Sequence, residues 1–167
     1  MGDTMDDGST WARPARFEDF YSVSWLEVYR PLAASIGDSD LAREAVDEAM
    51  VRAFASWGNV SAASNAEGWV YRVAYRWAVD RLRRRSTEKR LLSRMPARAD
   101  TAGSIDVEPG LIPALASLTV EQRTVVVLAC VFDWSEAQIA DATGVRPGTV
   151  KSRLHRGLKR LREEMNA

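Results

Sequence analysis

The side chains near the end of the chain have the types and spacing needed to bind DNA. If residues 147–165 form a helix that turns by about 100° per residue, hydroxyl groups and cations gather on one side of it. Arginine can bind guanine through two hydrogen bonds, and serine, threonine and lysine can bind phosphates or base edges. The pattern therefore predicts a duplex-binding surface, which we name the recognition face: Thr149, Lys151, Ser152, Arg153, His155, Arg156 and Lys159.

Two helices and a tight turn would position the recognition face. Ser135 and Gln138 have the spacing of a capping box, which predicts that a helix begins at Ser135. Gly144 can end that helix, because glycine adopts left-handed backbone angles without a steric penalty. Pro147 suits the first turn of the next helix. One side of that second helix would be buried, because its apolar residues recur at spacings of three and four: Val150, Leu154, Leu158, Leu161 and Met165.

This succession is typical of a helix-turn-helix, whose second helix enters the major groove of DNA. The alternative is a solvated charged face on an ordinary bundle helix. The capped helix and the turn before it favour DNA binding. For Arg153, an internal salt bridge is the alternative to a phosphate contact.

A second segment combines aromatic and basic side chains. Residues 69–90 have a helical apolar pattern, and Tyr71 and Tyr75 lie on a second side of the predicted helix. Aromatic rings among lysines and arginines are what many proteins use to stack on single-stranded nucleic acid. The alternative is that both tyrosines pack against the first helix of the chain. The sequence leaves both interpretations open.

The charged residues are separated along the chain although the net charge is zero. Residues 1–69 have 12 acidic and 5 basic side chains, and residues 99–145 have 7 acidic and 1 basic. Residues 70–98 have 10 basic and 2 acidic side chains, and residues 146–167 have 7 basic and 2 acidic. Two basic blocks, each after an acidic one, indicate two surfaces for polyanions and acidic surfaces for other partners.

The scarcity of reactive side chains excludes several classes of function. Cys130 is the only cysteine and His155 the only histidine, which excludes an intramolecular disulfide, a cysteine zinc cluster and a histidine-based triad. Cys130 lies in the apolar run VVVLACVF, where we expect a buried structural thiol. No paired carboxylates or phosphate-cradling loop indicate an enzyme, and we expect no catalytic residue, metal or cofactor. No apolar run is long enough to cross a membrane and the N-terminus is not a signal peptide, so we expect a cytoplasmic protein.

The helical patterns predict an all-α protein of two small domains joined by a flexible linker, with the helix-turn-helix in the second. Residues 1–14 would be a disordered leader, 15–90 the N-terminal domain, 91–110 the linker and 111–167 the C-terminal domain. The first helix would start at Phe17 and bend or break near Pro31. The second would start at Ser39 or Asp40 and end at Gly58, with a polar loop after it. In the C-terminal domain, Thr119 would cap a buried helix that includes Val125–Val127.

Three motifs, taken in order, resemble the extracytoplasmic-function sigma factors of bacterial RNA polymerase. GTVKSRLHRGLKRL at 148–161, preceded by SEAQIADATGV, resembles the C-terminal promoter-binding domain of that family. GWVYRVAYRWAVDRLRRR at 68–85 is similar to the segment that opens and reads the downstream promoter element. LAREAVDEAMVRAFASW at 41–57 is similar to the polymerase-binding helix. The first motif alone would fit other helix-turn-helix regulators, whereas the three in this order are specific.

The resemblance implies a factor that binds core RNA polymerase and directs it to promoters to initiate transcription. The N-terminal domain, similar to sigma region 2, would bind polymerase and recognise and melt the −10 element, and the C-terminal domain, similar to region 4, would recognise the −35 element through the recognition face. Polymerase would contact Glu44, Asp47, Glu48 and Arg52. The downstream element and its melted strand would contact Ser64, Asn65, Trp69, Tyr71, Arg76, Arg81 and Arg84. For Arg81, a structural salt bridge is the alternative.

The same resemblance implies three kinds of partner: core RNA polymerase, promoter DNA as duplex and as melted single strand, and an inhibitory anti-sigma factor. Two other classes of protein compete with this interpretation. A stand-alone helix-turn-helix regulator would bind operator DNA without polymerase, but it would have no use for a basic, aromatic helix far from its DNA reader. An adaptor that makes only protein contacts would not need two separate clusters of cations. A sigma factor is therefore the favoured interpretation.

Overall fold

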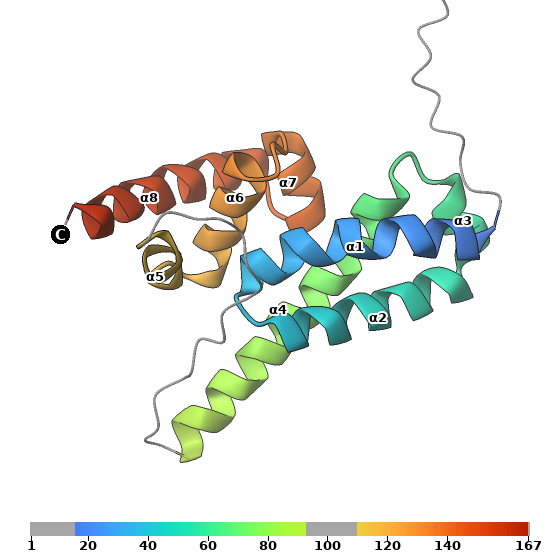
Figure 1. Cartoon of the computed structure of the whole chain (residues 1–167), viewed down its shortest axis with the longest axis horizontal. Helices are drawn as coiled ribbons and strands as arrows, with labels where there is room; N and C mark the ends of the chain where they lie inside the picture. Colours follow the sequence, from blue (N-terminus) through green and yellow to red (C-terminus); the bar gives the residue numbers. More distant parts are fainter. Residues whose placement is uncertain (1–15, 93–109, 167) are drawn as a thin grey trace, which may run out of the picture.

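The computed structural model describes residues 16–92 and 110–166, and these residues form helices and no strand. The all-α fold class is therefore confirmed. The predicted leader, 1–14, and residues 93–109 of the predicted linker lie outside the described residues, and the domain bounds stay a prediction. The N-terminal half contributes α1 (Phe17–Ile36), α2 (Ser39–Ala55), α3 (Trp57–Ala62) and α4 (Ala66–Leu92), and the C-terminal half contributes α5 (Leu111–Ala116), α6 (Val120–Cys130), α7 (Glu136–Thr143) and α8 (Pro147–Met165) (Figure 1).

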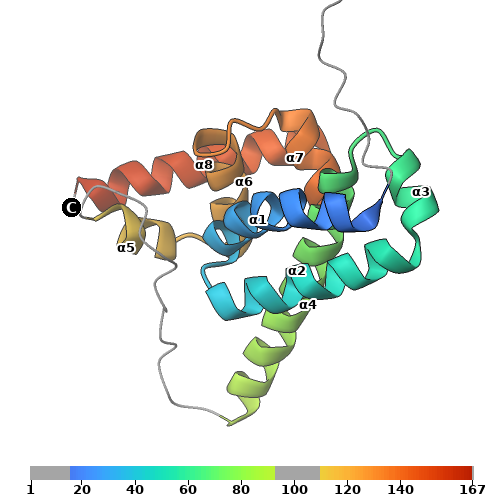
Figure 2. The same ribbon diagram turned by 45° about the vertical axis from the view of Figure 1, so that its right-hand side comes forward.

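A tight turn at Gly37 and Asp38 joins α1 to α2. Gly37 has a left-handed φ of 69°, and its N–H donates to the Ala33 carbonyl at 2.9 Å, which closes α1. One oxygen of the Asp38 carboxylate accepts from the Leu41 N–H at 2.8 Å and begins α2. The other oxygen accepts from Arg85 of α4 at 3.2 Å. The turn thus ties α1 and α2 to α4, which crosses behind them (Figures 1 and 2).

Alanines on one side of α2 allow its neighbours to approach closely. Ala42, Ala45, Ala49 and Ala53 have no exposed surface, and both α1 and α4 pack on this helix. Larger side chains fill the space around them: Phe20, Leu32, Leu41, Val46, Met50 and Val70. This core holds α2 and α4 side by side, and so it sets which of their polar residues share a surface.

The structure corrects the expected end of the second helix. The helix α1 is unbroken at Pro31, which lies inside it. The second helix ends at Ala55, and Gly58 lies inside the short helix α3, which occupies part of the expected polar loop. The cause is long-range packing, because the Trp57 ring lies 5.4 Å from that of Phe17 and 5.0 Å from that of Phe20. These contacts favour a short helix where the sequence predicted only the end of the second helix and a loop.

The helix-turn-helix forms where the sequence predicted it. The Ser135 hydroxyl accepts from the Gln138 N–H, and the Gln138 side chain accepts from the Ser135 N–H, so the capping box at α7 is complete. Gly144 ends α7 with a φ of 72°, and Pro147 is the first residue of α8. A second capping box, formed by Thr119 and Gln122, begins α6. Within α6 the run Val125–Val127 is buried and helical, as predicted. Met165, at the end of α8, is 51% exposed and is not buried with the rest of the apolar side of that helix.

The two halves share one hydrophobic core. The helix α6 packs against α1, and α7 packs against the first part of α4 (Figure 2). Val125, Leu128, Ile139 and Val150 from the C-terminal half belong to the same buried cluster as the core of α1, α2 and α4. A smaller cluster joins α5 to α6 and α8 through Ala114, Leu118, Val126 and Leu161. The far end of α4 extends beyond this packed body (Figure 1).

Candidate nucleic-acid interface

The recognition face lies on the solvent side of α8. Lys151, Ser152, His155, Arg156 and Lys159 are exposed, and Thr149 is half-buried. The opposite side of the helix is anchored, because Val150 is fully buried and Leu161 is 7% exposed. The Arg156 guanidinium donates to the Ser152 carbonyl at 3.2 Å and to the Ser152 hydroxyl at 3.5 Å, so it lies along the helix surface. This arrangement offers cations and hydroxyls to a duplex.

Arg153 differs from the rest of the recognition face. Its side chain is half-buried, and its positive charge acts on Tyr75 of α4. Burial raises the pKa of Tyr75, and the Thr124 hydroxyl and the Arg153 and Arg83 charges oppose that rise. Among the described residues, Arg153 has no acidic side chain within salt-bridge distance. It therefore does not form the internal salt bridge that was considered as the alternative to a phosphate contact.

The start of α4 carries the residues predicted to bind the melted strand. Asn65 caps this helix, since its side-chain oxygen accepts from the Gly68 N–H at 2.7 Å. A Cβ atom at Gly68 would lie 2.6 Å from the Asn65 side chain, so a larger residue at 68 would require that side chain to shift. Ser64 and Asn65 are exposed and Trp69 is half-buried. A cavity of about 270 Å³ separates this loop from α7 and is lined by Asn65, Gly68, Trp134, Ala137, Gln138, Asp141 and Ala142.

Tyr71 and Tyr75 pack inside the protein. Tyr71 is 1% exposed and Tyr75 is 5% exposed, and their rings stack with centroids 6.1 Å apart. The hydroxyls of Tyr71 and Ser35 on α1 share a hydrogen bond at 3.3 Å. The Trp134 ring, from the segment before α7, meets Tyr71 edge-on at 5.0 Å. Tyr71 therefore packs against α1, as the alternative predicted, and both tyrosines are buried in this arrangement.

A groove between α2 and α4 brings four arginines together. It has a volume of about 530 Å³, and we name it the arginine groove: Arg52, Val73, Arg76, Trp77, Asp80, Arg81 and Arg84. The Arg81 guanidinium lies over the Trp77 ring, 5.5 Å from its centroid, and so makes a cation–π contact in place of the salt bridge considered for it. Arg76, Arg81 and Arg84 are exposed. The four arginines outnumber the one carboxylate that lines the groove, that of Asp80, so the groove is positively charged. Such a surface suits a phosphate backbone.

The residues predicted to bind polymerase lie on the outer side of α2. Glu44, Glu48 and Arg52 follow one another at spacings of four, and Arg52 pairs with Glu48 at 2.8 Å. Asp47 is exposed and accepts a hydrogen bond from the Trp25 indole of α1 at 2.8 Å. Arg52 also lines the arginine groove, a position that the sequence did not reveal. Because Arg52 both pairs with Glu48 and lines the groove, the predicted polymerase surface lies beside the predicted DNA surface.

The structure corrects the expectation for Cys130. This thiol is exposed, because Cys130 is the last residue of α6 and lies past the buried stretch Thr124–Leu128. Within residues 16–92 and 110–166, no group of three histidine, cysteine or acidic side chains is placed to hold a metal ion. Over the same ranges, no helix is both long and apolar enough to cross a membrane.

Comparison with known proteins places this geometry in a family. Residues 111–161 match the family described as Sigma-70, region 4. An RNA polymerase sigma-E factor of Streptomyces antibioticus is 32% identical over 151 residues, which cover 89% of this chain and 84% of the relative. The chain belongs to the extracytoplasmic-function sigma factors. Another relative, the sigma factor SigW of Bacillus subtilis, is 27% identical over 168 residues, which cover 89% of this chain and 88% of SigW.

A solved structure supports the fold of this sigma factor. The sigma factor RpoE of Bartonella quintana, in complex with the anti-sigma factor NepR, superimposes with a TM-score of 0.71 at 22% identity. The match covers 90% of this chain and 97% of that chain. At this identity the likeness concerns the fold. In this sigma factor, the recognition face lies wholly within the segment that matches region 4, whereas the start of α4 and the arginine groove lie outside it.

Proposed function

We propose that this sigma factor binds core RNA polymerase and directs it to promoters through two DNA-binding surfaces. The observation that carries the proposal is the presence of two separate cationic surfaces on one chain, the recognition face on α8 and the arginine groove on α4. A regulator that reads only duplex DNA needs one such surface. The second suits a strand that has left the duplex, since it combines arginines with an aromatic ring.

Each surface has a distinct role in this proposal. The recognition face reads the upstream element, with Arg156 and Lys151 on base edges or phosphates and Thr149 and Ser152 as hydroxyl partners. The loop at Ser64 and Asn65, together with Trp69 and Tyr71, binds bases of the melted downstream strand, and Arg76, Arg81 and Arg84 hold its phosphates. Polymerase contacts α2 through Glu44, Asp47, Glu48 and Arg52.

The sigma factor performs this work by binding alone. Holding unpaired bases traps an opened duplex without breaking a covalent bond, so the protein is not an enzyme and requires no cofactor. It acts in the cytoplasm, together with polymerase. An anti-sigma protein, of the kind bound to the Bartonella sigma factor, is a further partner in this proposal.

Reconstituted transcription tests the proposal. Transcripts that accumulate when the full chain is overexpressed supply upstream sequences, from which a shared promoter motif is taken. Purified chain and core polymerase should then produce run-off transcripts from that promoter, whereas core polymerase alone should not. An operator-binding regulator would bind the same DNA and add no initiation, and that result would contradict the proposal.

A further inference from the structure

Asp80 of α4 is the one acidic side chain among the described residues that line the arginine groove. Arg76 lies four positions before it and Arg84 four positions after it, and all three side chains are exposed. Acidic and basic residues at this spacing commonly pair on a helix. Among the described residues, however, no cation lies within salt-bridge distance of the Asp80 carboxylate, and no donor forms a hydrogen bond with it.

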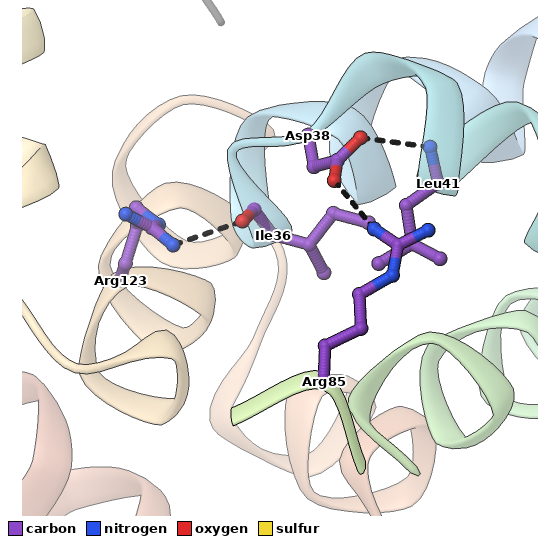
Figure 3. Close-up of polar contacts among 5 residues, drawn as sticks. All are labelled: Ile36, Asp38, Leu41, Arg85 and Arg123. Atoms are coloured by element: carbon purple, nitrogen blue, oxygen red, sulfur yellow. Dashed lines mark hydrogen bonds and ion pairs between the residues drawn. The ribbon is translucent and has the colours of Figure 1, made fainter. Parts of the chain in front are cut away.

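Other arginines of α4 contact other groups. Arg85 donates to the Asp38 carboxylate at 3.2 Å (Figure 3). Arg81, the residue after Asp80, lies with its guanidinium 5.5 Å from the centroid of the Trp77 ring. Asp80 therefore lies among arginines without pairing with any of them, and its carboxylate is open to a ligand.

This free carboxylate does not suit a groove that holds only phosphates. An ionised carboxylate repels a phosphate, and it can accept hydrogen bonds but cannot donate them. The groups of a DNA strand that can donate to it are the N–H groups on the edges of the bases. A groove that combines four arginines with Asp80 therefore suits a strand whose phosphates and one base are both bound.

Guanine matches a carboxylate better than the other bases do. Its Watson–Crick edge has two adjacent donors, the ring N1–H and the 2-amino group, and a carboxylate has two oxygens that can accept them. Adenine and cytosine have an unprotonated ring nitrogen beside the amino group, and thymine has a carbonyl on each side of its N–H. Each of these bases would bring an acceptor toward the carboxylate. In a duplex the guanine edge is paired with cytosine, so only an unpaired guanine can offer it.

The arginine groove also has a surface on which a base can lie. Trp77 is half-buried and lies three positions before Asp80, so the two side chains share one side of α4. The Arg81 guanidinium covers the Trp77 ring, and the half-buried Val73 lies one turn earlier. Aromatic rings and guanidinium groups both stack on unpaired bases. The groove thus provides a stacking surface and an acceptor for the edge of the same base.

We propose that Asp80 selects an unpaired guanine of the melted promoter strand by accepting hydrogen bonds from its N1–H and its 2-amino group. The base stacks on Trp77 and Arg81, while Arg76 and Arg84 hold the neighbouring phosphates. This selection deepens the proposed function and rests on it, since the arginine groove must hold the melted strand. It acts on the open strand alone, because pairing hides the guanine edge in a duplex.

Binding of short single strands to the reconstituted holoenzyme tests this selection. The probe is a fluorescent oligothymidylate of about 12 nucleotides, a length that a single-strand groove can hold. The competitors are the same strand with one central guanine, adenine or cytosine, and core polymerase alone is the blank. The strand with guanine should bind about tenfold more tightly than the unsubstituted strand, as expected for one bidentate base contact.

Two guanine analogues identify the edge that is read. Inosine lacks the 2-amino group and should lose most of the tenfold gain. The analogue 7-deazaguanine keeps the Watson–Crick edge but lacks N7, and it should bind as guanine does. Arginines read guanine through N7 and O6, so a preference that 7-deazaguanine abolishes belongs to the arginines and overturns the proposal. These measurements use the parent chain and do not depend on any variant.

The variant Asp80→Asn separates base selection from net charge. It should bind every strand more tightly, because a negative charge is removed, but its preference for guanine should disappear. Glu88→Gln removes the same charge at an exposed position of α4 outside the groove and should keep the preference. A preference that persists in Asp80→Asn overturns the proposal.

The strand without guanine distinguishes a failure of the selection from a failure of the proposed function. If the parent holoenzyme binds all strands equally and more tightly than core polymerase does, Asp80 selects no base, while the groove still holds a strand. If the holoenzyme binds no strand more tightly than core polymerase does, the role of the groove in the proposed function fails, and the selection fails with it.

Discussion

Arg156 and Tyr71 lie on different helices, and their burial decides what each can bind. Arg156 is exposed, and two contacts with Ser152 limit its conformations before DNA arrives. Tyr71 is 1% exposed, and its hydroxyl is already bonded to Ser35. Both were candidates for nucleic-acid contact on sequence grounds. Arg156 is open to solvent, whereas Tyr71 is buried in this arrangement.

Truncation of Arg156 should weaken recognition of the upstream element. If its guanidinium reads a base, Arg156→Ala should cost about 1–3 kcal/mol of binding free energy and relax selectivity at one base pair. Competition binding with single-base variants of the upstream duplex measures both effects. Lys159→Ala serves as the comparison, because a phosphate contact should weaken binding equally for every sequence. An unchanged affinity in Arg156→Ala would remove this residue from the recognition face.

Burial of Tyr71 should make the fold sensitive to high pH. Burial raises the pKa of this phenol well above its usual value near 10, and the Ser35 hydrogen bond only partly opposes that shift. Above about pH 10 the unfolded chain loses the proton and the folded chain keeps it, so stability falls as the pH rises. Tyr71→Phe should reduce that decline by about 1.4 kcal/mol per pH unit in urea unfolding between about pH 10 and 11.5.

Two further results decide the interpretation of the Tyr71 titration. Tyr21→Phe removes a phenol that is 42% exposed and should leave the decline as steep as in the parent. Tyr71→Phe should also be less stable near neutral pH, by about 1 kcal/mol, because it lacks the bond to Ser35. A decline equally steep in the parent and in Tyr71→Phe would show that other groups cause it.

At the scale of helices, a glycine of α8 packs directly against α6. Gly157 lies in the middle of α8 and is buried against α6. A Cβ atom at this position would lie 2.7 Å from a methyl group of Val126 and 3.5 Å from the Gln122 carbonyl oxygen. Valine has little freedom to turn aside, because two heavy atoms branch from its Cβ. Glycine therefore sets the distance between the two helices and the direction in which α8 presents its recognition face.

Gly157→Ala should destabilise the protein although alanine is the better helix former. The intrinsic gain of up to about 1 kcal/mol is outweighed by overpacking against Val126, which typically costs about 1–3 kcal/mol. Gly148→Ala, in the first turn of the same helix, has open space around its Cβ atom and should be neutral or stabilising. Thermal unfolding of both variants measures the difference. A higher melting temperature for Gly157→Ala would mean that α6 and α8 adjust freely.

Sequence reasoning succeeded for helices whose signals are local. The Ser135 capping box, the Gly144 helix end and the apolar side of α8 depend on residues within a few positions of one another, so the helix-turn-helix and its exposed face could be predicted. The helix α3 could not, because it depends on Trp57 meeting Phe17 and Phe20 about forty residues earlier in the chain. The apolar run around Cys130 indicated a buried thiol. Cys130 is exposed instead, because it is the last residue of α6 and only one side of that helix is buried.

The residues that the sequence did not reveal act across long separations. Arg52 joins the arginine groove only because α2 packs beside α4. Arg123 of α6 donates to the Ser35 and Ile36 carbonyls at the end of α1, because α6 packs against α1. A signal for Arg123 was present, since it is the one basic residue between 99 and 145, but composition does not say which carbonyls it meets.

At the scale of the whole molecule, a net charge of zero conceals two cationic surfaces. The basic residues of segment 70–98 fall partly in the arginine groove, and those of 146–167 lie along α8. Binding to promoter DNA should therefore release counterions from both surfaces despite the neutral total. The logarithm of affinity should fall linearly with the logarithm of salt concentration, with a slope set by the number of phosphates held rather than by net charge.

Removing one arginine of the arginine groove should change that slope by the amount expected for one phosphate contact. Arg84→Ala should make the slope of holoenzyme binding to promoter DNA less steep by about 0.7 if Arg84 holds a phosphate of the melted strand, and by about 0.9 if it holds one of the duplex. Arg162→Ala, at an exposed arginine of α8 outside the recognition face, should leave the slope as it is. Affinity measured at four or more salt concentrations gives both values. A slope that Arg84→Ala does not alter would mean that the groove holds no promoter phosphate at this position, and the cations of α4 would then have to serve a protein partner.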